Sequence, residues 1–291
     1  MRLRPFAHID VFAGRPGAGN PLAVVLDAEG LSTDQMQSIA AWTNVVETTF
    51  LLPPSTPEAS YRVRIFTPHR EIPFAGHPSL GSAQAWLEAG GKINDDDELI
   101  QECGAGLLPI HVEDREGLRR LFFRTPPVQS VRTATDGEPG LAAAVSGIAL
   151  GTLPPALVEA GRRWWLVELA SEASLRALRP DLDAIAQWSR LSDSMGMCVF
   201  ARCHDRPYQL AVRAFAPAFG ISEDPASGAA NATIAAWLRH AGALHTVGDE
   251  YSVSQGREIG RDARIELRVR PNGAIWVGGE TQTVVRGTIA W

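Results

Sequence analysis

FAGHPSLGSAQAWL, residues 74–87, is the stretch that decides how this sequence folds. It begins around Gly-His-Pro and then holds mostly Gly, Ser and Ala until Trp86, and DPASGAANATIAAWL at 224–238 has the same character. Alanine and leucine favour a helix, and small side chains let surrounding strands pack closely against it. We therefore predict two buried helices, over residues 78–90 and 224–242, each inside its own sheet.

The two stretches belong to an internal repeat. The matches, each about 150 residues apart, are Phe66-Thr67-Pro68 with Phe215-Ala216-Pro217, Pro78–Gly81 with Pro225–Gly228, and Ala85–Leu87 with Ala236–Leu238. A repeat of this length predicts two related half-domains, over 1–126 and 127–280, with residues 281–291 returning as a strand to the first. A ligand site is expected at the interface of two such units.

Alternating apolar residues bounded by turn residues predict strands around both helices. These strands lie near residues 8–14, 21–27, 45–54, 61–68, 97–101, 107–113 and 119–124, and near 164–170, 197–202, 208–217, 251–256, 263–270, 274–279 and 283–291. Ser32 and Gln35 form a capping-box pattern for a helix over 31–42, and further helical pieces are predicted at 139–148 and 174–191. The predicted fold class is α+β, with two pseudo-symmetric half-domains, each a curved, mostly antiparallel, barrel-like sheet around a central helix.

Composition narrows the class of function. The chain has 291 residues, 45% of them hydrophobic, and a net charge of −6 with no basic cluster, which argues against a nucleic-acid partner. No apolar run reaches the roughly 18 residues of a membrane span, and the N-terminus does not read as a signal peptide. An odd count of three cysteines fits the reducing cytoplasm, and the histidines show no metal-ligand spacing. We expect a cytoplasmic protein with no metal and no membrane partner.

The two helix starts suggest a binding site for an anion. Pro78 and Pro225 suit the first helical position, which places His77 and Asp224 at the N-caps. The small residues that follow leave the first N–H groups uncovered, and such N–H groups bind carboxylates. The alternative is that Asp224 is only a cap and that the small residues only permit close packing.

Glu47 is the candidate acid or base. In VVETTFLL it shares a strand face with Val45, Thr49 and Leu51, and burial on that face would raise the pKa of its carboxyl group. A raised pKa suits general acid/base catalysis near neutral pH. The alternatives are an edge-strand glutamate that faces water and, for His77, an ordinary cap or core histidine.

Several motifs together resemble the PhzF-like family of phenazine biosynthesis, which has the diaminopimelate epimerase fold. They are HIDVFAGRPGAGNPLAVVLD, LSTDQMQSIAAWTNVVETTFLLPP, RIFTPHREIPFAGHPSLGSA, FAPAFGISEDPASGAAN, QGREIGR and VGGETQTVVRG, in an order that spans His8 to Gly287. The resemblance implies proton transfer without a cofactor, on a small acidic metabolite, in a cleft between the half-domains of a homodimeric isomerase. It implies that Glu47, His77 and Asp224 are catalytic. The substrate-binding residues that it implies are Asn20, Gly76, Ser79, Ser227, Gly228 and Ala229.

Two departures from the family pattern bear on the substrate. The family commonly reads EDPATGSA where this chain has EDPASGAA, so Ala229 stands where the namesake uses a serine in its substrate site. The paired cysteines of the epimerases and proline racemases of this fold are also missing from the positions around His77 and Asp224. The first departure puts an anthranilate-type substrate in doubt, and the second argues against two-thiol racemisation.

Three hypotheses about function remain. The first is a cofactor-independent isomerase of a small carboxylate. The second is a racemase, epimerase or dehydratase of an amino or hydroxy acid, with carboxylates in place of thiols. The third is a non-catalytic metabolite-binding protein.

Overall fold

The computed structural model describes residues 2–115 and 118–291, which divide into two compact units. The first unit comprises Met1–Arg124 and Gly278–Trp291, and the second comprises Thr125–Val277. Each unit holds strands and one long buried helix, so the fold is α+β as predicted. No helix of the described residues is long and apolar enough to cross a membrane.

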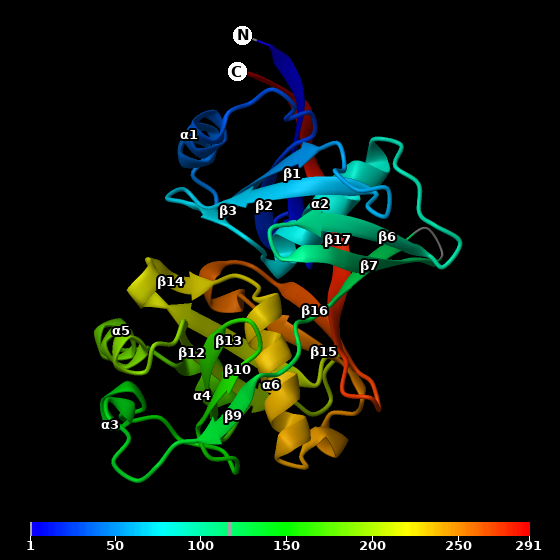
Figure 1. Cartoon of the computed structure of the whole chain (residues 1–291). Helices are drawn as coiled ribbons and strands as arrows, with labels where there is room; N and C mark the ends of the chain where they lie inside the picture. Colours follow the sequence, from blue (N-terminus) through cyan, green and yellow to red (C-terminus); the bar gives the residue numbers. More distant parts are fainter. Residues whose placement is uncertain (1, 116–117) are drawn as a thin grey trace. The chain divides into compact units, whose positions relative to one another are not determined.

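The first unit is a closed barrel around a helix (Figure 1). Its strands are β1 (Leu3–Val11), β2 (Asn20–Val25), β3 (Glu47–Leu52), β4 (Tyr61–Phe66), β5 (Glu71–Ile72), β6 (Glu98–Cys103), β7 (Gly106–Arg115), β8 (Leu118–Arg124) and, from Gly278 on, β17 (Ile275–Ala290). The pairing runs β17–β1–β2–β3–β4–β6–β7–β8, and β8 pairs with β17 to close the barrel. The last two predicted strands, 274–279 and 283–291, form the single strand β17, because its extended backbone continues through the glycines between them.

The central helix of this barrel is α2 (Gly76–Glu88), which contacts β1, β2, β3, β6 and β8. Small residues are needed here because a Cβ atom added to Gly81 would lie 2.5 Å from a methyl group of Leu22. The second helix of the unit, α1 (Thr33–Thr43), connects the parallel strands β2 and β3. It begins with the predicted capping box, in which Ser32 and Gln35 bond to each other's backbone N–H groups.

The second unit repeats this order of elements. Its strands are β9 (Ser130–Thr133), β10 (Ala156–Glu159), β11 (Arg163–Glu168), β12 (Gly196–Arg202), β13 (Leu210–Ala216), β14 (Ile221–Asp224), β15 (Glu250–Gln255) and β16 (Ala263–Val269). Its helices are α3 (Leu141–Ala144), α4 (Glu172–Ala177), α5 (Leu182–Leu191) and α6 (Gly228–His240), and short 3-10 turns lie at η1 (Pro217–Phe219), η2 (Leu244–Thr246) and η3 (Arg257–Ile259). The helix predicted at 139–148 is limited to the short α3, because Gly140 and Gly147 adopt positive φ angles around it.

The pairing of strands confirms the internal repeat. From β10 to β16 the neighbours alternate antiparallel, parallel, antiparallel, parallel and antiparallel, as they do from β1 to β7. In each unit a hairpin (β4–β5 or β13–β14) leads into the long buried helix. The repeat in sequence therefore encodes a repeat in topology.

Candidate functional site

Glu47 and His77 meet in the first unit. Glu47 is the first residue of β3, and His77 is the second residue of α2. The carboxyl oxygen Oε2 of Glu47 lies 3.4 Å from Nε2 of His77, and the two side chains are only 13% and 8% exposed. The structure thus brings together Glu47 and His77, the two residues of this half that the family resemblance implies to be catalytic.

His77 is neutral in this environment. Burial lowers the pKa of His77 to about 3, and a hydrogen bond to the carbonyl oxygen of Pro21 opposes that shift only in part. A 3.4 Å separation would also suit an ion pair, but the cost of charging an imidazole away from water prevails. With one ring nitrogen donating to Pro21, the other presents its lone pair toward Glu47. A hydrogen bond between Oε2 of Glu47 and Nε2 of His77 therefore requires an added proton between these two acceptor atoms.

The partner of His77 could not have been found from the sequence. Pro21 acts through its backbone carbonyl group, which every residue carries. The buried carboxylate of Asp10 accepts a hydrogen bond from the backbone N–H of Gly19, which fixes the turn that precedes Pro21. Asp10 could have been noticed in the sequence, because it is an acidic residue within the apolar strand HIDVFAG. A buried carboxylate needs a hydrogen-bond donor, so its presence there indicates a structural contact.

Three further predicted residues, Asn20, Gly76 and Ser79, belong to this unit. Asn20 is the buried first residue of β2, next to Pro21. Gly76 starts α2, and a Cβ atom there would lie 2.5 Å from the ring of Phe123. Ser79 is fully buried, where its hydroxyl donates to the carbonyl of Ala75 and accepts from Nε2 of Gln101. The hydroxyl of Ser79 is thus engaged within the barrel.

Asp224, Ser227, Gly228 and Ala229 lie in the second unit. Asp224 is the last residue of β14, and its Oδ1 accepts a hydrogen bond from the N–H of Ala226. Ser227 is the N-cap of α6, and its hydroxyl accepts from the N–H of Ala230. Gly228 begins the helix.

The prediction that His77 and Asp224 are matched N-caps is wrong. The N-caps are Ala75 and Ser227, so Pro78 lies in the third position of α2 and Pro225 precedes α6. Asp224 is a residue type that favours the N-cap and Ala75 is not, so residue type pointed to the wrong caps.

The strand pairing gives the true correspondence between the units. Ile72 pairs with Ile65 in the first unit, and Asp224 pairs with Ala214 in the second. Since Phe66 matches Phe215, Asp224 corresponds to Ile72 and the turn Pro225–Gly228 corresponds to Pro73–Gly76. His77 therefore corresponds to Ala229, and neither His77 nor Asp224 is matched by a polar residue in the other unit.

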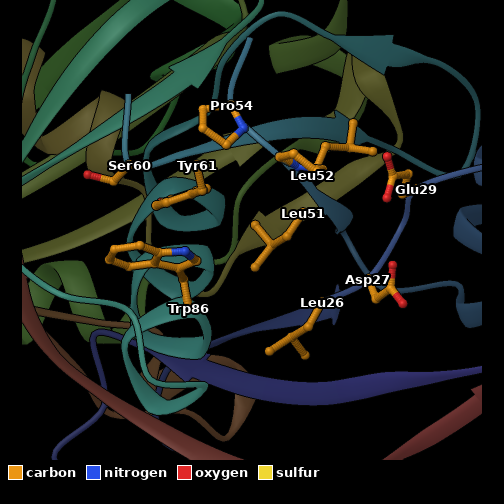
Figure 2. A pocket seen from close by; sticks show the side chains of 10 residues that line it. Leu26, Asp27, Glu29, Leu51, Leu52, Pro54, Ser60, Tyr61 and Trp86 are labelled. Carbon is orange, nitrogen blue, oxygen red and sulfur yellow. The ribbon is translucent and has the colours of Figure 1, made fainter. Parts of the chain in front are cut away.

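A pocket of about 290 Å³ lies elsewhere in the first unit (Figure 2). It includes Leu51 and Leu52 at the end of β3 and Trp86 near the end of α2, whereas Glu47 and His77 stand near the beginnings of those elements. Its lining residues are Leu26, Asp27, Glu29, Leu51, Leu52, Pro53, Pro54, Ser60, Tyr61 and Trp86. The pocket therefore contains none of the predicted site residues.

Among the described residues, neither the cysteines nor a cluster of metal-binding side chains forms a second candidate site. Burial raises the pKa of all three thiols, that of Cys203 to about 11, which disfavours the reactive thiolate. Within residues 2–115 and 118–291, no group of three or more His, Cys, Asp or Glu side chains is placed to hold a metal ion.

Comparison with known proteins identifies the family. Residues 9–288 match the family model described as phenazine biosynthesis-like protein. The chain is 36% identical to the trans-2,3-dihydro-3-hydroxyanthranilate isomerase of Pseudomonas chlororaphis over 98% of both chains. It is 33% identical to Antisense-enhancing sequence 1 of Schizosaccharomyces pombe over 99% of both chains.

Solved structures show the same fold. A PhzF-family protein of Bacillus anthracis superposes with a TM-score of 0.85, at 26% identity and full coverage of both chains. A probable proline racemase of Agrobacterium radiobacter superposes with a TM-score of 0.67 over 99% of this chain and 93% of the other, and at 15% identity that likeness concerns the fold alone. On the family match and these relatives, the chain belongs to the phenazine biosynthesis-like family, which includes named isomerases.

Proposed function

We propose that this protein is a cofactor-independent isomerase that moves a proton within a small carboxylate-bearing metabolite. The observation that carries the proposal is the contact between Glu47 and His77, a buried carboxyl group beside a neutral imidazole that together can hold one proton. General acid/base groups of this kind contribute about 10²–10⁴-fold to a rate. Glu47 is assigned as the group that removes and returns the substrate proton, and His77 as its hydrogen-bond partner.

Asp224 and the start of α6 supply the second half of the proposed site. We place the substrate in a cleft between the half-domains, where Asp224 orients it. Backbone N–H groups near Gly76 and Gly228 are assigned to its carboxylate, because helix starts favour anions. The remaining candidate substrate-binding positions are Asn20, Ser79, Ser227 and Ala229. The hydroxyl of Ser79 donates to the carbonyl of Ala75, so we expect it to support the start of α2 rather than to contact the ligand.

The substrate class follows from the relatives and from Ala229. The Pseudomonas relative is named for trans-2,3-dihydro-3-hydroxyanthranilate, so this compound is the first to test. Ala229 offers no hydroxyl, so we expect weaker binding of it than a serine at that position would give. The homodimer expected from the resemblance stays a prediction, which the solution mass of the protein checks.

A substrate panel separates this proposal from its alternatives. The purified protein is incubated with trans-2,3-dihydro-3-hydroxyanthranilate, proline, hydroxyproline and other amino acids, and products are followed by NMR and chiral chromatography. A shifted double bond without inversion supports the isomerase. Inversion at an α-carbon would instead establish a racemase, and saturable binding without any product would establish a metabolite-binding protein.

A further inference from the structure

The turn that carries Asp224 is tied to a buried glutamine outside the predicted site. Gln255 is the last residue of β15 and is fully buried. Its Nε2 donates to the carbonyl oxygen of Asp224 at 2.8 Å, and its Oε1 accepts from the backbone N–H of Ser227 at 3.3 Å. One side chain thus spans the turn from the end of β14 to the cap of α6.

Two neighbours reinforce this connection. Asn231, in the first turn of α6, donates from Nδ2 both to Oε1 of Gln255 at 2.9 Å and to the carbonyl of Ser227 at 2.8 Å. Gly256 follows Gln255 with a φ of +89°, and a Cβ atom there would lie 2.6 Å from the carbonyl oxygen of Pro225. The end of β15 therefore approaches the turn more closely than a side chain at Gly256 would allow.

The strand before the turn is fixed separately. Glu223 forms a two-pronged ion pair with the buried Arg213, through Nε at 3.0 Å and Nη2 at 2.8 Å. Successive strand residues point to opposite faces, so this pair directs the side chain of Asp224 to the other face. Arg213 holds the turn on its strand side, and Gln255 holds it on its helix side.

The first unit lacks this glutamine. There Gly104 lies close to Pro73, as Gly256 lies close to Pro225. A Cβ atom added to Gly104 would lie 2.8 Å from the Cα atom of Pro73. Cys103 consequently stands in the place of Gln255, and the matched turn carries Ile72 rather than an acid. The glutamine accompanies the turn that presents a carboxylate.

We propose that Gln255 is a positioning residue, which fixes the Asp224–Ser227 turn so that the Asp224 carboxyl group and the α6 N-terminus keep the geometry that proton transfer needs. This inference rests on the proposed function for its catalytic consequence. Its structural part, the hold on the turn, can be measured without any substrate.

Three variants test the role of Gln255. Gln255→Leu removes all three hydrogen bonds at similar volume. Gln255→Glu keeps the acceptor for Ser227 and Asn231, but when ionised it turns a second acceptor toward the carbonyl of Asp224. Val253→Ala is the matched control, because Val253 is a fully buried residue of the same strand and its truncation removes only packing.

The first measurement is hydrogen–deuterium exchange of the peptide over residues 224–231. We expect Gln255→Leu to raise exchange there roughly tenfold, as loss of buried hydrogen bonds implies, while Val253→Ala changes it only as much as the rest of the unit. Equal exchange in the two variants would overturn the proposal. This result holds whether or not the substrate has been identified.

The second measurement is steady-state kinetics with trans-2,3-dihydro-3-hydroxyanthranilate. We expect Gln255→Leu to lower kcat about tenfold or more with little change in KM, whereas Val253→Ala keeps both constants. In Gln255→Glu, a protonated carboxyl group can again donate to Asp224, so its activity relative to wild type should rise as the pH falls. An unchanged kcat in Gln255→Leu, or a flat activity ratio across pH in Gln255→Glu, would overturn the catalytic part. A wild-type protein inactive on this compound would count against the proposed substrate, while the exchange data would still decide whether Gln255 holds the turn.

Discussion

The two turns that enter the buried helices share a backbone plan but carry different chemistry. Pro73–Gly76 and Pro225–Gly228 both follow a hairpin strand and both end at the first residue of a helix. Before the first turn stands Ile72, and before the second stands Asp224. After the first comes His77, and after the second comes Ala229. The repeated fold supplies the scaffold, and single-residue differences between its copies supply the polar groups.

The strands beneath the turns differ in the same way. Thr48 pairs with Phe66, and Met197 pairs with Phe215, so the residue that matches Glu47 is Gly196. A Cβ atom on Gly196 would lie 1.8 Å from the carbonyl oxygen of Phe215, whereas the first unit accommodates a glutamate side chain beside His77. The contact between Glu47 and His77 therefore has no counterpart in the second unit.

The largest expected effect on activity comes from replacing Glu47 of β3 by glycine, the residue that stands at the matching position of β12. Glu47→Gly should lower kcat by about 10³-fold, because it removes the proposed general acid/base group. Its free energy of unfolding should fall by only about 1 kcal/mol, the cost of a glycine within a strand. Turnover of the substrate and urea denaturation measure the two quantities. A variant that loses activity only because it unfolds would break the comparison.

The reverse change is expected to act on stability. Gly196→Ala should lower the free energy of unfolding by about 3 kcal/mol, since β12 must shift to relieve a contact with the carbonyl of Phe215. Denaturant titration checks this value. The control is Ser222→Ala, at an exposed position of β14. A substitution at Gly17 would meet no atom within 4 Å, but the positive φ of that residue would strain any side chain. If Gly196→Ala were as stable as Ser222→Ala, β12 would have room for a side chain at position 196, contrary to this prediction.

His77 should make stability depend on pH. The unfolded chain binds a proton at this residue below about pH 6.5, while the folded protein resists protonation until about pH 3. The contribution of His77 is therefore present above pH 6.5 and is lost as the pH falls, by about 1.4 kcal/mol per pH unit. Stability measured from pH 7 to 5 should fall less steeply in His77→Gln, and an equal slope in both proteins would contradict a neutral buried imidazole.

The smallest predicted effect concerns the helix caps. Ser227→Ala should cost about 1 kcal/mol, because the hydroxyl caps the N–H of Ala230. Ala75, the N-cap of α2, makes no side-chain cap bond, so Ala75→Gly should change stability by only a few tenths of a kcal/mol. Thermal unfolding of both variants measures the difference, and equal losses would show that the two helix starts are alike after all.

Much of this architecture could be predicted from the sequence. The alternation of strands and the two small-residue helices indicated barrels with buried helices, and an acid within ETTF indicated Glu47. The match of Pro78–Gly81 with Pro225–Gly228 was misleading, because the motif falls inside α2 but before α6. The contacts of Pro21 and Gln255 were also missed. The first uses a backbone carbonyl, and the second depends on a strand that reaches the turn only in the folded chain.

The most direct test of the central claim is the incorporation of solvent deuterium into the substrate. In D₂O, the wild-type protein should place deuterium at the carbon that gains a proton, and Glu47→Gln should abolish this incorporation. Asp224→Asn should slow it but retain it, because the proposed mechanism has Asp224 orient the substrate and Glu47 carry the proton. Incorporation that persists in Glu47→Gln would show that another group moves the proton and would contradict the account.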